Sequence, residues 1–267
     1  MPFSNFHLTK LYKYTKIYLT TILGEHMSDL RRFFLDSKIE IGDTITMGDE
    51  EFRHVVNVLR AKVGESILLC DNTGYEYTAT ITAIEKKSLT AKVEHCEFSQ
   101  TEPKNKVVLI AGYLKGDKTE LVVQKAVELG VNKIVVFNSK FCSAFMNDNK
   151  LARLNKVSVE ASKQCGRAIA PSVEYADNFS DALQFGVQSE NKLFACEFAT
   201  KNEVDFSTLQ GDTAIVVGSE GGFSEQEYQT ALDLGYKTVY LGKRILRAET
   251  ASIALCGIIM QALGELE

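Results

Sequence analysis

Two glycine-containing segments near the end of the chain have residue types that suit contact with a small ligand. The first, GSEGGFS (Gly218 to Ser224), follows an apolar run and precedes residues that are acidic. Gly218, Gly221 and Gly222 let the backbone approach a ligand closely. Ser224 and Glu227 have the spacing of a helix capping box. The segment lacks the GxGxxG pattern, which disfavours a dinucleotide. A tight strand-to-helix turn without a ligand explains the glycines equally well.

The second segment, LGKRILRAETAS (Leu241 to Ser252), places cations and apolar residues together before an expected helix. A loop folded over an amphipathic ligand explains Ile245 and Leu246 between cations better than an ordinary surface loop does. Exposed N–H groups at the helix start could assist binding. The run that follows is so apolar that we expect it in the core or at a subunit interface.

Composition narrows the class of protein. The 267 residues suffice for one large domain or two smaller ones, and we favour two. No apolar run approaches the roughly 18 residues that a membrane span requires. The cysteines form no CxxC pair and the histidines no cluster, so we expect no metal site, no disulfide scaffold, and reduced thiols in the cytoplasm. The six cysteines are Cys70, Cys96, Cys142, Cys165, Cys196 and Cys256.

Charge is unevenly distributed. The formal net charge of -5 speaks against nucleic-acid binding, but the stretch from Lys140 to Arg167 holds six cations against two carboxylates. A second basic group near the front surrounds His54; it consists of Arg31, Arg32, Arg53, Arg60 and Lys62. A solvated surface is the alternative reading, because Asp49, Glu50 and Glu51 interrupt this group.

The pattern of apolar residues changes along the chain. From Arg32 to Glu97, short alternating runs separated by turn formers predict a small antiparallel barrel, interrupted by one helix over residues 50–60. Ser99 to Asn105 is polar and predicts a linker. We therefore divide the chain into 1–26, a leader that is non-native or disordered; 27–98, the barrel; 99–105, the linker; and 106–267, an α/β domain.

In the α/β domain, near-continuous apolar runs of the buried parallel-strand type alternate with helical patterns. The strands are expected over 106–114, 133–138, 192–198, 213–219 and 237–242, and the helices over 117–129, 147–165, 224–234 and 250–263. Gly130 and Gly235 stand where helix C-caps are expected. This alternation predicts a doubly wound α/β fold with its ligand at the carboxyl ends of the strands.

The first 26 residues do not form a signal peptide pattern. Met27 is followed at once by SDLRRFF, where an ordered element could begin, and Gly24 to His26 can be encoded by a purine-rich sequence typical of a bacterial ribosome-binding site. We hypothesise that Met27 is the natural start. N-terminal mass spectrometry of the native protein tests this, and a peptide beginning before Met27 would contradict it.

Six motifs in the same order resemble the RsmE family, bacterial 16S ribosomal RNA uracil-N3 methyltransferases of the SPOUT superfamily. Besides GSEGGFS and LGKRILRAETA, they are RRFF (31–34), HVVNVLR (54–60), KGDKTELVVQKAVELGV (115–131) and EASKQCGR (160–167), so the resemblance covers Leu30 to Leu263. It implies a PUA-like barrel, an α/β domain with a C-terminal trefoil knot, and a homodimer acting on 16S ribosomal RNA or the small ribosomal subunit. The cofactor implied is S-adenosylmethionine, held by Gly218, Glu220, Gly221, Leu241, Gly242, Ile245 and Leu246.

This chain departs from the family pattern at three places. Ser219 and Lys243 stand where the family usually has proline, which loosens both loops without removing a chemical group. Lys140 stands near where the family usually has an arginine, and lysine cannot reproduce bidentate phosphate binding.

The implied reaction requires a proton to leave uracil N3, or the resulting anion to be stabilised. No histidine lies in the α/β domain, so an imidazole base could come only from His54 or His95, if the front domain folds across the site. We hypothesise that Arg247 or Arg167 stabilises the anion and that Glu249 or Glu220 accepts the proton; salt bridges and helix capping are the alternative roles. The residues expected to contact RNA are Arg31, Arg32, His54, Arg60, Lys163 and Arg167.

Two other classes of function remain open. Another SPOUT methyltransferase would act on transfer RNA or on a ribose 2′-hydroxyl. A non-catalytic RNA-binding assembly factor would have lost the cofactor, which the intact glycines and RILRAETA speak against.

Overall fold

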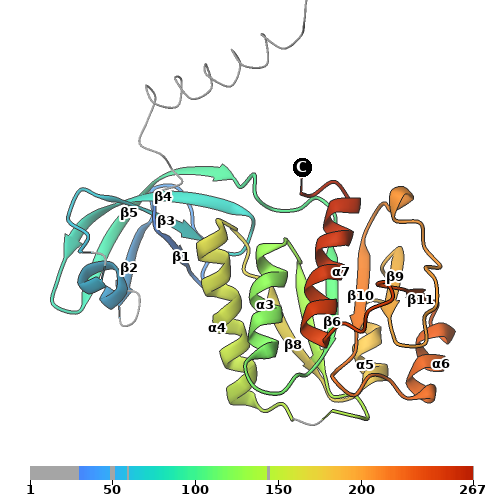
Figure 1. Ribbon diagram of the computed structural model, residues 1–267. Coiled ribbons are helices and arrows are strands. Elements are labelled where there is room, and N and C mark those ends of the chain that lie inside the picture. The colour runs from blue at the N-terminus through green and yellow to red at the C-terminus, as the bar shows by residue number, and fades with distance from the viewer. Residues whose placement is uncertain (1–29, 49–51, 59, 143–144, 267) are drawn as a thin grey trace, which may run out of the picture. The chain divides into compact units, whose positions relative to one another are not determined.

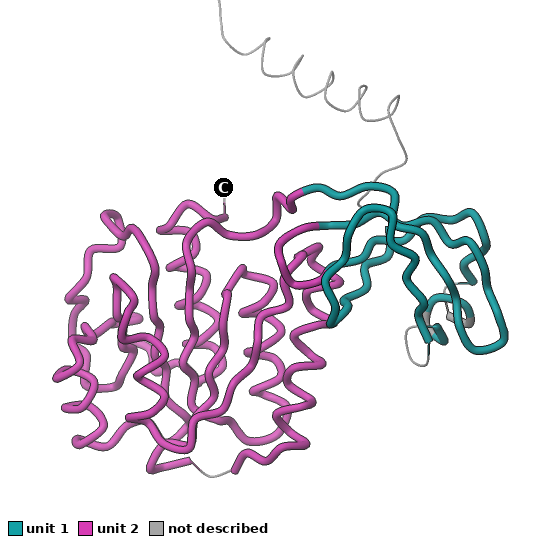
Figure 2. Tube along the Cα trace, turned by 180° about the vertical axis from the view of Figure 1, so that it is seen from behind, with its two compact units in different colours: residues 1–70, 76–97 teal, residues 71–75, 98–267 magenta. Residues whose placement is uncertain are grey.

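A computed structural model describes residues 30–48, 52–58, 60–142 and 145–266, with the side chains of 54, 57 and 58 excepted. The hypothesis about Met27 therefore lies outside the described residues. The chain forms two compact units, one of residues 1–70 and 76–97 and the other of residues 71–75 and 98–267 (Figure 2). Within the described ranges, no helix is both long and apolar enough to cross a membrane.

The first unit is built on a five-stranded sheet of order β1-β3-β4-β5-β2. Its strands are β1 (Arg32–Phe34), β2 (Thr44–Gly48), β3 (Ser66–Cys70), β4 (Tyr75–Ile84) and β5 (Ser88–Phe98). β2 pairs with β5 and β3 with β4 in antiparallel fashion, but β1 runs parallel to β3. The expectation of a purely antiparallel barrel was therefore wrong at β1, because β2 and a helical turn intervene between the two strands and return the chain in the same direction.

The helix expected over residues 50–60 is described only in its middle part, where it is wider than an α-helix. The described part is a π-helix, η2, at Arg53–Val58. Phe52 and Val55 of the predicted apolar stripe are buried in the core of this unit, Val56 is half-buried, and Leu59 lies outside the described residues.

The second unit contains a six-stranded sheet of order β11-β9-β10-β6-β7-β8 in which every pairing is parallel (Figure 1). The strands are β6 (Val107–Gly112), β7 (Lys133–Phe137), β8 (Ser172–Ala176), β9 (Asn191–Ala195), β10 (Thr213–Val217) and β11 (Lys237–Val239). The five expected strands are confirmed. β8 was not predicted, because its sequence SVEYA is not a continuous apolar run and holds a glutamate.

Helices cover both faces of this sheet, as a doubly wound fold requires. They are α3 (Lys118–Glu128), α4 (Asp148–Cys165), α5 (Phe179–Gln184), α6 (Glu225–Asp233) and α7 (Ala248–Ala262), with a short 3-10 turn, η3, at Phe206–Thr208. α3 packs against α4 and α7 on one face, and α5 packs against α6 on the other (Figure 1). Four helices were predicted; α5 is too short to show helical periodicity. Gly130 and Gly235 have positive φ, as expected of residues that follow helix ends.

The strand order reverses between β6 and β10. β6, β7 and β8 follow one another outward in one direction, whereas β9, β10 and β11 lie on the other side. In open parallel sheets, ligands bind outside the carboxyl ends of the strands at such a switch point. The two glycine-containing segments begin at the carboxyl ends of β10 and β11.

Candidate functional site

A cavity of about 750 Å³, here called the large cavity, lies at the carboxyl ends of β9, β10 and β11. Both glycine-containing segments line it, although they are separated in sequence by α6 and β11. All seven residues assigned to the cofactor are among its walls: Gly218, Glu220, Gly221, Leu241, Gly242, Ile245 and Leu246. Its volume falls in the range of about 300–1,000 Å³ that is typical of small-molecule and cofactor sites.

The glycines of the first segment are required by close neighbours. A β-carbon on Gly221 would press on the Cβ and carbonyl oxygen of Phe141, and one on Gly218 would lie 2.8 Å from the ring of Phe223. Gly222 has φ +68°, and its position is crowded by the Glu197 carboxylate. Steric packing alone therefore accounts for part of the glycine pattern.

The end of the first segment starts a helix as predicted. Ser224 and Glu227 form a capping box, each side chain accepting from the other's backbone N–H. Glu197 Oε1 accepts the N–H of Phe223 at 2.9 Å. These contacts fix the exit of the segment from the cavity.

Ser219, the position where proline is usual, is buried and has a specific partner. Its hydroxyl lies 2.8 Å from the hydroxyl of Ser139, at the end of β7. A hydrogen bond to the segment that follows β7, on the far side of β6 in the sheet, thus restrains the loop where a proline ring would have done so.

Lys118, at the start of α3, joins two carboxylates of the site. Its Nζ lies 3.0 Å from Glu220 Oε1 and 3.9 Å from Glu249 Oε1. Glu220 Oε1 also accepts the backbone N–H of Lys115 at 3.3 Å. Burial acts to raise the pKa of Glu220, but hydrogen bonds from Lys118 and backbone N–H groups, with the charge of Lys118, outweigh it and hold the pKa below 4.5.

Glu249 differs from Glu220 in the hydrogen bonding of its carboxylate. It is buried in the first turn of α7, and its Oε2 has no hydrogen-bond partner among the described residues. Glu249 itself is not a lining residue; Lys118, which it contacts, is.

The second segment presents its side chains openly. Ile245 is 102% exposed, an unusual state for an isoleucine, and Leu246 is half-buried. Arg247 is exposed, lines the large cavity and immediately precedes α7. An apolar side chain and a cation are therefore both available to a ligand.

Arg167 lies elsewhere and is used by the fold. Its side chain is 3% exposed, pairs with Glu102 at 2.8 Å and donates to the carbonyl oxygens of Val127 and Val131. The Glu102 carboxylate also accepts the backbone N–H groups of Ala168 and Ile169. A buried guanidinium with these partners cannot reach a uracil or a phosphate, so the structure gives Arg167 a structural role in place of the catalytic and RNA-binding ones expected.

The other residues expected to contact RNA differ in their exposure and in their ion-pair partners. Arg31 and Arg60 are exposed on the first unit, whereas Arg32 is held at 2.9 Å by Glu76 with both side chains 10% exposed. Lys163 pairs with Glu160 at 2.7 Å on α4. The side chain of His54 lies outside the described residues.

Several residues of the large cavity were not predicted. Lys118 lies in one of the six motifs that resemble the RsmE family, but no role was predicted for it. Cys196 and Glu197 follow β9 directly. Their position at a strand end was the signal that could have identified them. No cluster of three or more potential metal ligands occurs among the residues that the structure describes.

The fold and the cavity are those of an RNA methyltransferase. The RNA methyltransferase domain family matches residues 101–260, more than half of the chain, and the RNA methyltransferase PUA domain family matches residues 48–94. More specifically, the chain belongs to the family of ribosomal RNA small subunit methyltransferase E.

Known relatives are similar over nearly their whole length. The enzyme of Mesomycoplasma hyopneumoniae, named ribosomal RNA small subunit methyltransferase E, is 34% identical over 84% of this chain and 96% of its own. The Bacillus subtilis enzyme of the same name is 30% identical over 87% and 97%. The crystal structure of the Neisseria gonorrhoeae enzyme bound to S-adenosyl methionine has a TM-score of 0.78 at 32% identity and covers 88% of this chain and 98% of that one.

Proposed function

We propose that this protein transfers a methyl group from S-adenosylmethionine to N3 of a specific uridine in 16S ribosomal RNA. The observation that carries the proposal is that two segments following different strands line one cavity, in a fold whose Neisseria gonorrhoeae relative was solved with this cofactor.

The large cavity suits the parts of that cofactor. Glycine backbone at Gly218, Gly221 and Gly242 and apolar walls at Leu241 and Leu246 suit adenine, which is flat and can be read by backbone hydrogen bonds. Lys118 and Glu220 offer both charges to an amino acid end, which carries an ammonium and a carboxylate. When bound, S-adenosylmethionine supplies a methyl group on a positively charged sulfur.

The chain's own residues must orient the uracil and manage the proton on N3. Arg247, exposed at the cavity wall, would stabilise the anion spread over the uracil carbonyl oxygens. Glu220 is a weak base at neutral pH because its pKa is lowered. Glu249, whose Oε2 has no hydrogen-bond partner among the described residues, is the other candidate to accept the proton, and it would act from behind Lys118.

RNA binding is assigned to both units. The barrel, residues 27–98, would bind RNA through the exposed Arg31 and Arg60. After the linker, residues 99–105, α4 of the second unit would bind RNA through Lys163. Because N3 lies on the pairing edge, the target uridine must be unpaired or extruded from a helix. Phosphate contacts would hold the surrounding strand.

Three further features follow from the family. In the domain of residues 106–267, the C-terminal part of the chain, after β10, would form a trefoil knot. Two copies would form a homodimer through α7, whose Ile258 is 40% exposed although the helix is largely apolar. Acting on ribosomal RNA, the enzyme would work in the cytoplasm.

Calorimetry and mass mapping test the proposal. Calorimetric titration should show S-adenosylmethionine binding, and mass mapping of 16S RNA from a deletion strain should show one uridine without its methyl group. Cofactor binding with an unchanged 16S RNA would point to transfer RNA or a ribose hydroxyl as the substrate. Absence of cofactor binding would point to a non-catalytic assembly factor.

A further inference from the structure

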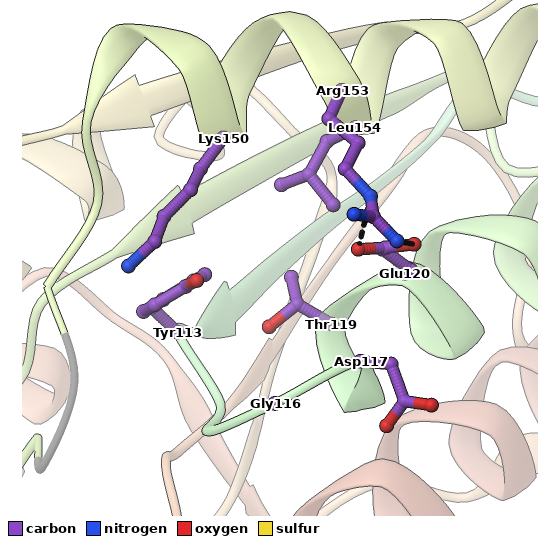
Figure 3. Close-up of a pocket in the computed structure, with 8 residues that line it drawn as sticks. All are labelled: Tyr113, Gly116, Asp117, Thr119, Glu120, Lys150, Arg153 and Leu154. Carbon is purple, nitrogen blue, oxygen red and sulfur yellow. Dashed lines mark hydrogen bonds and ion pairs between the residues drawn. The ribbon is translucent and has the colours of Figure 1, made fainter.

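A second cavity, here called the small cavity, lies beside α3 and α4 and has a volume of about 290 Å³ (Figure 3). It is formed by the residue after β6, the loop into α3, and the first two turns of α4. The lining residues are Tyr113, Gly116, Asp117, Thr119, Glu120, Lys150, Arg153 and Leu154. Neither the cofactor nor the catalytic residues of the proposed function occupy it.

The two cavities are neighbours because one short segment serves both. Lys118 lines the large cavity and holds Glu220, whereas the residues on either side of it, Asp117 and Thr119, line the small one. The start of α3 therefore forms part of the wall of both cavities.

The floor of the small cavity is apolar and aromatic. Tyr113 and Leu154 are buried, and the Thr119 hydroxyl is satisfied by the backbone of Leu114. Lys150 is exposed, donates to the carbonyl oxygen of Phe145, and holds its Nζ 5.1 Å from the centre of the Tyr113 ring (Figure 3). An exposed lysine thus lies over the aromatic ring.

The rim carries a second cation. The Arg153 side chain is 68% exposed and pairs with Glu120, with Nε 2.7 Å from Oε1. Arg153 Nη2 also donates to Glu120 Oε2 at 2.9 Å, so the pair is bidentate, and a phosphate would add to it through Nη1 rather than replace Glu120. Its planar guanidinium suits a phosphate well.

We propose that the small cavity receives the base of a nucleotide flanking the methylated uridine, with Arg153 and Lys150 on its phosphate. The proposal rests on the proposed function in taking single-stranded RNA as the substrate. Stacking of a base on an aromatic ring is a stronger contact than a cation over the ring at an exposed site, so the base displaces Lys150 from Tyr113. The released ammonium then meets the phosphate.

The charges favour a nucleotide within a strand over a free anion. Glu120 and Asp117 line the same cavity as the two cations, and their carboxylates would repel a phosphate that entered deeply. A base inside and a phosphate at the rim avoid that repulsion. The surrounding strand supplies the remaining binding energy through the large cavity.

Variants of the rim and the floor test the proposal by RNA affinity. The dissociation constant of the S-adenosylmethionine-loaded protein for 16S ribosomal RNA is measured by filter binding. Arg153→Glu should weaken binding about tenfold and reduce the salt dependence, as loss of a phosphate contact does. Tyr113→Leu should weaken it about tenfold and Tyr113→Phe less than twofold, because only the ring is needed.

Matched controls separate this site from general charge effects and from misfolding. Lys237→Glu makes the same change of sign at the opposite, amino end of β11 and should alter affinity less than twofold. Calorimetric affinity for S-adenosylmethionine should stay unchanged in Arg153→Glu and Lys237→Glu, which reports that the fold is intact. Arg153 is exposed, so Arg153→Glu should fold; if Tyr113→Leu fails to fold, RNA binding by Arg153→Glu within twofold of wild type is enough to overturn the inference.

The results separate this inference from the proposed function. If the wild-type protein methylates 16S RNA while Arg153→Glu and Tyr113→Leu both bind RNA within twofold of it, the inference is overturned and the function stands. If RNA binding weakens as expected but no methyl group is transferred, the methyl-transfer function fails, while the small cavity is still supported as a site for an RNA base. A wild-type protein that binds no RNA overturns both.

Discussion

Gly112 at the end of β6 lies directly against Ser219, the residue that follows β10 and Gly218. A β-carbon placed on Gly112 would overlap the backbone nitrogen of Ser219 and lie 2.8 Å from the carbonyl carbon of Gly218. The two strands are neighbours at the point where the strand order reverses. The backbone of the first glycine-containing segment thus rests on the end of β6, which fixes one wall of the large cavity.

Gly112→Ala should damage the site and the fold together. The added methyl group meets the backbone of Gly218 and Ser219, and overpacking of this kind costs about 1–3 kcal/mol or more. We expect a lower denaturant midpoint and weaker S-adenosylmethionine binding by calorimetry. Gly48→Ala is the control, because its β-carbon would meet only the Lys87 carbonyl oxygen at 3.8 Å. Equal stability of the two variants would contradict the close contact.

Lys118→Met should weaken S-adenosylmethionine binding about tenfold. The substitution removes the cation that holds Glu220 at 3.0 Å and faces Glu249 at 3.9 Å, and a hydrogen bond to a charged group contributes about 1.5–3 kcal/mol, less where water reaches it. Lys115→Met is the matched control, since only the backbone N–H of Lys115 contacts Glu220. Calorimetry measures both. Similar affinity in the two variants would show that Lys118 does not organise the site.

Glu220 should make stability depend on acid pH. Its folded-state pKa is lower than the ordinary value of 4.5, so the ionised carboxylate stabilises the fold above that value and the stabilisation is lost as pH falls through the folded pKa. Below about pH 5, the free energy of unfolding should fall more steeply for wild type than for Glu220→Gln. The difference should be small, because the side chain is 32% exposed. In a Lys118→Met background it should shrink further; an unchanged difference would exclude Lys118 as a cause.

Local sequence patterns predicted most of the second unit but not its long-range pairings. Five strands and four helices were found because apolar runs and helical periodicity depend on nearby residues. β8 and α5 were missed, being short and only partly apolar. The cavity was predictable as strand ends followed by glycines, whereas the partners of Lys118 and Arg167 were not, because Glu220 and Glu102 are distant in sequence and only the fold brings them close.

Cys196 should react slowly with thiol reagents at neutral pH. Burial raises the pKa of its thiol to about 11, although hydrogen bonds from the backbone of Phe198 and Ala199 act in the opposite direction. The thiolate is the reactive form, so the rate of alkylation, followed by peptide mass spectrometry, should rise about tenfold per pH unit up to about pH 10. Cys196 lines the large cavity, so S-adenosylmethionine should slow the reaction further. A rate that levels off near pH 8 would contradict the raised pKa.

Arg167→Ala should lower stability without removing a group from the site. Its loss leaves the Glu102 carboxylate, whose side chain is 7% exposed, buried without its cation, and breaking a buried pair in this way costs about 3–5 kcal/mol. Removing both charges in Arg167→Met with Glu102→Gln should recover part of that loss, because no unpaired charge remains. Chemical denaturation measures the stabilities, and calorimetry at low temperature should show S-adenosylmethionine bound as in wild type. A stable Arg167→Ala protein that binds cofactor but transfers no methyl group would instead restore the catalytic role that the sequence predicted.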